Sequence, residues 1–164
     1  MTRRMRIEDL TGLAVPSHPT LSPDGGRIAY VLRTLDVDRD RNIDQLWLVA
    51  VDGSAPLRLT SGPADSAPAW SPDGRRLAFG SQREGSFDVW VMNADGSGQQ
   101  RLTHGPDGES PVAWLPDGRI VYSSFHGQEP LPRWYLMDAD GTGVRSLPQL
   151  DGAGDPIDWL ATAG

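Results

Sequence analysis

Three histidines, His18, His104 and His126, are the side chains of this sequence best suited to proton transfer or metal binding. A metal site needs converging ligands, and none of the three has a second histidine or an acid at a helical or hairpin spacing typical of such a site. Serines and aspartates are abundant enough to complete a Ser-His-Asp triad, but the sequence has no nucleophile elbow or other signature of an activated serine. We therefore expect loop or surface histidines, and we predict no catalytic, cofactor-binding or metal-binding residue.

The acidic run DVDRDRNID carries oxygen ligands at alternate positions, which is how a calcium-binding loop begins. Those positions are Asp36, Asp38, Asp40, Asn42 and Asp44. The calcium-loop template also requires glycine at its sixth position and glutamate at its twelfth, where this sequence has Arg41 and Trp47. The template therefore fails, and we expect a solvated loop in which neighbouring opposite charges pair locally.

The composition of the 164 residues excludes several classes of function. There is no cysteine, so no disulfide, thiolate zinc site or cysteine nucleophile can form. The net charge of −7 argues against nucleic acid as a partner, because phosphate binding requires clustered lysine and arginine. No apolar run approaches the roughly 20 residues that a membrane-spanning helix needs, and there is no clear signal peptide. We expect a cytoplasmic protein without a nucleic-acid or membrane partner.

Three copies of one pattern, about 44 residues apart, organise the chain. Each copy has a first turn with the letters PDG and a second turn with the letters DG. The turn aspartates are Asp24, Asp73 and Asp117 in the first series and Asp52, Asp95 and Asp140 in the second. The runs between the turns alternate polar and apolar residues, so each copy is expected to form four antiparallel strands. Because proline presets the turn backbone and glycine accepts a positive φ, the repeated letters describe a scaffold rather than a site.

Four strands in about 44 residues are the size of one β-propeller blade, so we predict an all-β fold of about three blades. A β-sandwich also has short strands at this spacing, but it gives no reason to repeat the turn sequences in register. The predicted segments are an N-terminal cap segment at 1–16, with a short helix over 6–17, and a propeller at 17–164, with blades at about 17–65, 66–109 and 110–155 and a starting strand at 156–159. Closed propellers usually need about 4–8 blades, so the ring is either incomplete or completed by a second copy.

Tryptophans recur in register with the repeat and are therefore expected to pack between blades. Trp70, Trp114 and Trp159 end the first strands, and Trp47 and Trp90 stand in the third strands. Trp134 is out of register, beside the repeat's aromatic position at Tyr135, and should point to the opposite face of its strand. The third copy departs most from the pattern, and its loop at 125–133 is the best candidate in the sequence for a contact surface.

The segments LSPDGGRIAY and WSPDGRRLAF, with LWLVAVDGSAPLRLT and VWVMNADGSGQQRLT, resemble the WD40-like (TolB-type) β-propeller repeat. The first half, from IEDLTGLAVPS to RRLAFGSQR, is also similar to the N-terminal propeller of prolyl oligopeptidase-family serine peptidases, above all the acylaminoacyl-peptidase branch. In that family the propeller restricts access to a separate α/β-hydrolase domain. The chain lacks the G-x-S-x-G motif of that domain and has no room for it, so the resemblance implies an architectural role only.

Together these observations predict a non-catalytic β-propeller module for protein–protein interaction or scaffolding, without a cofactor and with an unidentified protein or peptide partner. Two copies could form a homodimer through their open blade faces. One alternative is a detached or truncated substrate-gating propeller of a prolyl oligopeptidase-family peptidase, inactive without its hydrolase domain. A second alternative is an enzyme whose site forms in the central channel of a dimer.

Overall fold

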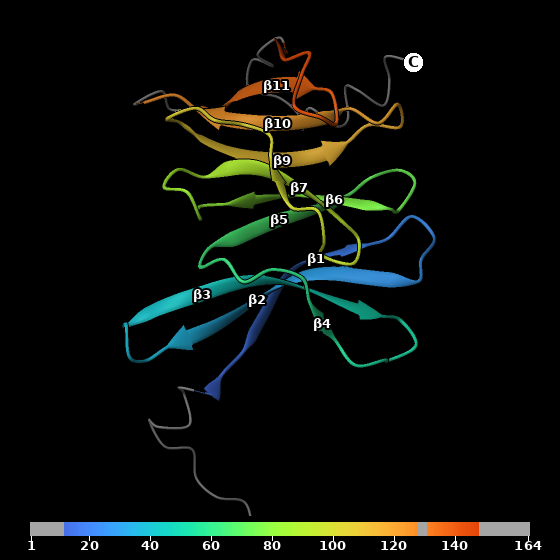
Figure 1. The fold of residues 1–164 in the computed structure, drawn as a ribbon, viewed down its shortest axis with the longest axis vertical. Helices are drawn as coiled ribbons and strands as arrows, with labels where there is room; N and C mark the ends of the chain where they lie inside the picture. Colours follow the sequence, from blue (N-terminus) through green and yellow to red (C-terminus); the bar gives the residue numbers. More distant parts are fainter. Residues whose placement is uncertain (1–11, 128–130, 148–164) are drawn as a thin grey trace, which may run out of the picture.

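The computed structural model describes residues 12–127 and 131–147, which form three four-stranded antiparallel sheets and no α-helix (Figure 1). The first sheet contains β1 (Val15–Leu21), β2 (Arg27–Asp36), β3 (Arg41–Ala50) and β4 (Leu57–Arg58). The second contains β5 (Asp65–Trp70), β6 (Arg76–Ser81), β7 (Asp88–Asn93) and β8 (Gln100–Arg101). The third contains β9 (Gly108–Trp114), β10 (Ile120–Phe125), β11 (Arg133–Met137) and β12 (Arg145–Ser146).

In each sheet the strands pair in the order of the chain, which is the pattern of a propeller blade. We call the sheets blades 1, 2 and 3. They are stacked face to face, with blade 2 between the other two (Figure 1). The predicted all-β fold of three four-stranded blades is confirmed, and the ring is not closed within the described residues.

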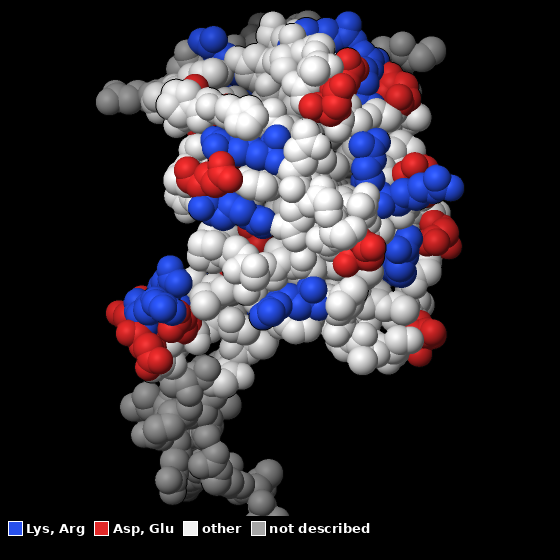
Figure 2. Space-filling view, viewed as in Figure 1, with Lys and Arg blue, Asp and Glu red and all other residues white. Residues whose placement is uncertain are grey.

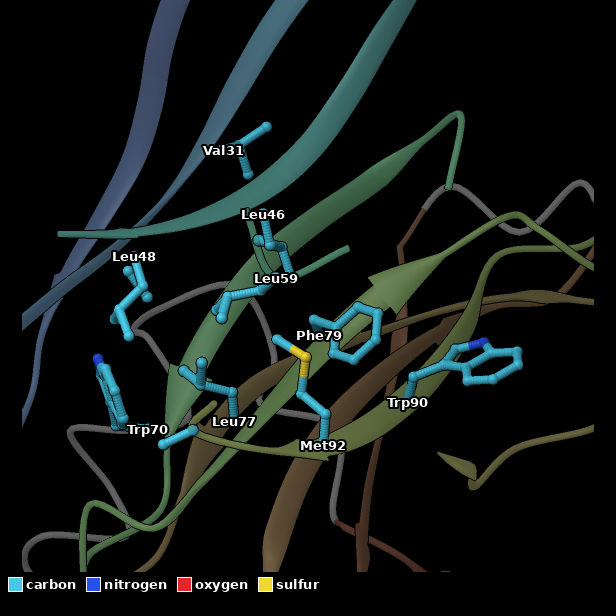
Figure 3. Packing of buried hydrophobic residues seen from close by; sticks show 11 residues of the cluster. Val31, Leu46, Leu48, Leu59, Trp70, Leu77, Phe79, Trp90 and Met92 are labelled. Carbon is cyan, nitrogen blue, oxygen red and sulfur yellow. The ribbon is translucent and has the colours of Figure 1, made fainter. Parts of the chain in front are cut away.

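The blades pack through side chains that alternate along their strands. We call the side of a blade that faces the preceding blade its front, and the other side its back. The front of blade 2 meets the back of blade 1 in one apolar cluster (Figure 3). Blade 1 contributes Ala29, Val31, Leu46, Leu48 and Leu59, and blade 2 contributes Trp70, Leu77, Phe79, Trp90, Met92 and Ala94. Phe79 is fully buried there, and burial of such a side chain contributes about 1.5–3 kcal/mol.

The back of blade 2 repeats this arrangement against the front of blade 3. Blade 2 contributes Ala78, Val89, Val91 and Leu102, and blade 3 contributes Ile120, Tyr122 and Met137 with the half-buried Trp114 and Tyr135. The sequence of β6 explains how one strand serves both interfaces. Leu77 and Phe79 point to the front, while the small Ala78 and Gly80 point to the back and leave room for blade 3.

The repeated aspartates hold turns together. The hydroxyl of Ser71 donates to Asp73 Oδ1 at 2.6 Å and the backbone N–H of Arg75 donates to the same oxygen, so the PDG turn closes on itself. The hydrogen bond from Ser71, followed by that from the backbone, lowers the pKa of Asp73. In blade 3 Leu115 replaces the serine, and Asp117 pairs with Arg119 instead. These aspartates therefore belong to the scaffold, as the repeat predicts.

Two local expectations change. β1 begins at Val15, inside the stretch for which the sequence predicts a short helix, and residues 6–11 of that stretch lie outside the described residues. The acidic run is mostly strand, because β2 continues to Asp36 and β3 starts at Arg41, which leaves only residues 37–40 as a turn. Within the described part of the chain, no helix could cross a membrane.

Candidate binding surfaces

The tryptophans at the ends of β5 and β9 contact the preceding blade. Trp70 Nε1 donates to the backbone carbonyl of Thr20 at 3.2 Å, and the Arg27 guanidinium lies 4.9 Å from the centre of the Trp70 ring. The same pairing recurs one blade later, where Arg76 lies 5.0 Å from the ring of Trp114. The prediction that these tryptophans pack between blades is confirmed for both, while Trp159 lies outside the described residues.

The front of blade 1 is built like the fronts of blades 2 and 3, but no preceding blade covers it among the described residues. Cross-strand pairing places Ile28, Tyr30 and Leu32 of β2 on this face, with Trp47 and Val49 of β3 beside them. In the other two blades, the positions of Ile28 and Tyr30 are occupied by Leu77 and Phe79 and by Ile120 and Tyr122, which are at most 6% exposed. In blade 1 both residues are only half-buried.

A groove of about 460 Å³ runs over this face. It is lined by Pro16, Ser17, Pro19, Ile28, Tyr30 and Leu32. Leu21, which pairs with Ile28 and stands where the next two copies have tryptophan, is 57% exposed. We call Leu21, Trp47 and the groove residues the open front face. Its central side chains carry no charge, which is the composition of a blade interface rather than of a solvated surface.

Exposed apolar residues gather at the two outer blades. In or beside blade 1 they are Leu13, Val15, Leu21, Leu35, Val37, Val51 and Leu57, and in blade 3 they are Phe125, Leu131 and Val144. None belongs to blade 2, because both of its faces are covered. On the side shown in Figure 2, charges of both signs gather over the β2–β3 hairpin and leave uncharged surface beside it.

The back of blade 3 differs from the open front face, because its apolar side chains are buried. Val121 and Leu136 are 0% and 2% exposed, and neither belongs to the cluster with blade 2. Trp134 shares this face, since it pairs with Ser123, whereas Tyr135 packs toward blade 2. The predicted opposite orientation of these two aromatic residues is therefore confirmed. In the predicted contact loop, Phe125 and Leu131 are exposed, and residues 128–130 lie outside the described residues.

Ion pairs with buried aspartates line the edge of blade 2 at which β5 and β7 begin. Asp65 accepts a hydrogen bond from Ser81 at 2.6 Å and pairs with Arg83 at 3.2 Å. Asp88, which is fully buried, pairs with Arg101 at 2.9 Å. Arg83 also lies 4.6 Å from the centre of the Trp90 ring and covers it. These charges are engaged within the fold, so they hold the blades rather than a ligand.

Asp88 and Glu109 form a pair of buried carboxyl groups between blades 2 and 3. The two groups lie within hydrogen-bonding reach, and Asp88 Oδ1 and Glu109 Oε2 are buried without a donor. Burial is the main cause that raises the pKa of Glu109; the hydrogen bond from Thr103 opposes the rise, and the charges of Asp88 and Asp107 add to it. A proton on Glu109 would satisfy both buried oxygens at once.

His126 takes part in a cluster that the sequence did not reveal. Its Nδ1 lies 2.8 Å from Asp107 Oδ2, and its Nε2 lies 2.9 Å from the hydroxyl of Tyr135. Asp107 precedes β9 while Tyr135 is in β11, so no local spacing could have shown the contact. The other two histidines are exposed, as expected. The histidine contacts a tyrosine and not a serine, and the described residues contain no group of three acids or histidines able to hold a metal ion.

Stacked four-stranded antiparallel sheets with inter-blade tryptophans define the chain as part of a β-propeller. Residues 41–155 match the family model of the Tricorn protease N-terminal beta propeller domain, and the chain belongs to this family. Over 123 residues it is 33% identical to the uncharacterized peptidase YuxL of Bacillus subtilis, a match that spans 74% of this chain and 19% of the relative.

Two solved structures agree with this assignment. Putative TolB from Agrobacterium tumefaciens superposes with a TM-score of 0.65 and 29% identity over 80% of this chain and 49% of that chain. The β-propeller domain of the Trilobed protease from Pyrococcus furiosus superposes with a TM-score of 0.64 and 18% identity over 85% of this chain and 45% of that chain. The resemblance to TolB and to peptidase propellers is confirmed, and the chain spans about half of these structures and about a fifth of the peptidase.

Proposed function

We propose that this chain is a non-catalytic propeller module that binds a protein partner through the open front face of blade 1. This proposal rests mainly on one observation: the equivalent faces of blades 2 and 3 are buried against a neighbouring sheet, while the front face of blade 1 is not. An exposed apolar face of this kind on a folded protein is typical of a protein contact. The uncharged groove favours a partner that also presents apolar side chains.

The polar residues of the described part support a binding role over catalysis. The buried carboxylates Asp65 and Asp88 are paired with arginines, and the turn aspartates hold their own turns. His126 is bonded to an acid and a tyrosine at the edge of a blade, without a serine nucleophile. None of these groups lines the groove over blade 1, which is mostly apolar; its polar members are Tyr30 and Ser17, whose hydroxyl lies 3.1 Å from Nδ1 of the exposed His18.

A second candidate function follows from the relatives that are named as peptidases. In that case the module would restrict access to an α/β-hydrolase domain, and the open front face would contact the rest of such an assembly. The match to YuxL covers 19% of that protein, so its activity would need parts that this chain does not match.

Photo-crosslinking tests the proposal. Benzoylphenylalanine in place of Leu21 should give a discrete covalent protein adduct, whereas the same group in place of Leu57, which is also exposed but on the other side of blade 1, should not. An adduct with a polypeptide that carries a hydrolase domain would favour the second candidate. Absence of any adduct at Leu21, or hydrolysis of acyl-peptide substrates by the purified chain, would refute a non-catalytic binding module.

A further inference from the structure

A glycine in the second turn of each blade marks where that blade rests on the preceding one. A Cβ atom added to Gly96 would lie 3.0 Å from the backbone carbonyl oxygen of Leu59, and one added to Gly141 would lie 3.0 Å from that of Leu102. Gly53 occupies the same turn position in blade 1, with a similar positive φ, but nothing lies within 4 Å of its added Cβ. The turn of blade 1 therefore has the same glycine as the other two turns, but it lacks their contact with a preceding blade.

The leucines that receive these turns form a second series. Leu59 and Leu102 each follow the fourth strand of their blade and donate their N–H to the third strand, to Leu46 and Val89 respectively, at 2.8 Å. Leu147 makes the same bond to the carbonyl of Trp134, also at 2.8 Å. No described blade follows Leu147, so the repeat leaves one unmatched glycine at the front of blade 1 and one unmatched leucine at the back of blade 3.

We propose that the protein partner is a second copy of this chain, bound head to tail. The open front face and Gly53 of each copy would pack on the back of blade 3 and Leu147 of the other copy. Two such contacts, related by a two-fold axis, close a ring of six blades, because a head-to-tail contact that returns on itself leaves no free end. This inference rests on the proposed function, since it names the partner of the same face.

The size of a solved propeller agrees with two copies to a ring. The chain covers 45% of the Trilobed protease β-propeller domain, so two copies approach the length of that domain. Each chain carries a net charge of −7, and two copies repel each other at long range. An uncharged contact face is what such a pair requires, and the open front face provides it.

The back of blade 3 sets a limit on the strength of the contact. Val121 and Leu136 are already buried in the single chain, so the second copy must replace contacts that this face has. Binding energy is reduced by whatever contacts are given up, so buried area overstates the affinity. We expect a dimer that dissociates on dilution rather than an obligate one.

Multi-angle light scattering of the purified chain over a range of concentrations tests the inference. The mass should rise from 17.8 kDa toward twice that value and stop there. Leu21→Arg and Leu147→Arg should each remain monomeric, because each places a charge in both contacts of the ring. Leu57→Arg is the matched control: this residue is also exposed, but it pairs with Leu48 on the other side of blade 1, and its variant should still dimerise.

Mixing the two monomeric variants tests the head-to-tail geometry. In a mixed pair both charges fall in one contact, and the other contact is intact, so an equimolar mixture should form dimers at a higher concentration than the wild type. A wild type that stays at 17.8 kDa, a mass that grows beyond two copies, or a Leu147→Arg variant that still dimerises would each overturn the inference. A monomeric wild type whose position 21 still crosslinks to another polypeptide would leave the proposed function standing.

Discussion

Replacement of Glu109 by glutamine should remove a component of the pH dependence of folding. Glu109 is 8% exposed and faces Asp88, which pairs with Arg101 at 2.9 Å. Thr103 donates to Glu109, and Asp107 lies nearby with His126. Tyr122 is also close: its burial, and then the charge of Glu109, raise the pKa of Tyr122 to about 12. Burial, followed by the nearby carboxyl of Asp88, raises the pKa of Glu109, so we expect Glu109 to hold the shared proton. A glutamine amide can donate the same hydrogen bond at every pH.

Proton linkage gives the direction in which the free energy of unfolding changes with pH. The pKa of Glu109 is raised in the folded state above its value of about 4.3 in an unfolded chain. Between these two values the folded state holds a proton that the unfolded state has lost, so the free energy of unfolding falls as pH rises. The stabilisation is complete below the unfolded pKa and is lost as pH passes the folded pKa. One proton corresponds to a slope of at most about 1.4 kcal/mol per pH unit.

Urea denaturation at a series of pH values, followed by tryptophan fluorescence, measures this effect. The free energy of unfolding of Glu109→Gln minus that of the wild type should be flat below about pH 4, rise by up to about 1.4 kcal/mol per pH unit, and then level off. The turn aspartates have lowered pKa values and the opposite pH dependence, but they are common to both proteins and cancel. Glu84→Gln is the control, because it replaces an exposed acid that also pairs with Arg101. Its free energy of unfolding, plotted against pH, should run parallel to that of the wild type. A constant difference for Glu109→Gln would refute the shared proton, and a falling one would mean that the ionised form is favoured.

Two comparisons test the packing of the blades by chemical denaturation at low protein concentration. Gly96→Ala should cost at least about 1 kcal/mol more than Gly53→Ala, since both strain a positive φ but only the first adds overpacking against the preceding blade; equal costs would contradict the turn contact. Arg101→Met should cost about 3–5 kcal/mol because it leaves Asp88 buried and unpaired, whereas Arg33→Met breaks an exposed pair and should change stability by less than about 1 kcal/mol. Similar losses from the two arginine variants would show that the buried pair is not specially placed.

The blade pattern was predictable because it is local and repeated. The turn sequences, the alternation of polar and apolar residues, and the spacing of Trp70 and Trp114 can all be read within one period of the sequence. Each of these signals independently indicates the same blade. The acidic run was harder, because the alternating charges that look like a calcium loop also fit the exposed face of a strand. Leu35 pairs with Asn42, and the preceding residue Thr34 pairs with Ile43. Ordinary strand pairing, with its alternation of faces, therefore continues into the run.

The contacts between blades could not be predicted in the same way. Asp88 and Glu109 belong to different blades, and nothing in their spacing distinguishes them from solvated acids elsewhere in the chain. His126 likewise meets Asp107 only because the loop before β9 folds against the end of β10. Such pairs depend on how two sheets stack, which a single-period pattern does not encode.

The same limit explains why the repeat is most informative where it fails to repeat. A tryptophan, a glycine or a leucine in register predicts that its environment is also repeated, and in blades 2 and 3 the structure agrees. Gly53 and Leu21 keep the positions but lack the neighbour, and Trp47 is only half-buried where Trp90 is covered. A substitution that matters in blade 2 but not at the equivalent place in blade 1 of the monomer therefore measures the missing neighbour directly. If dimerisation then makes the blade 1 position equally sensitive, the neighbour has been supplied by the second copy.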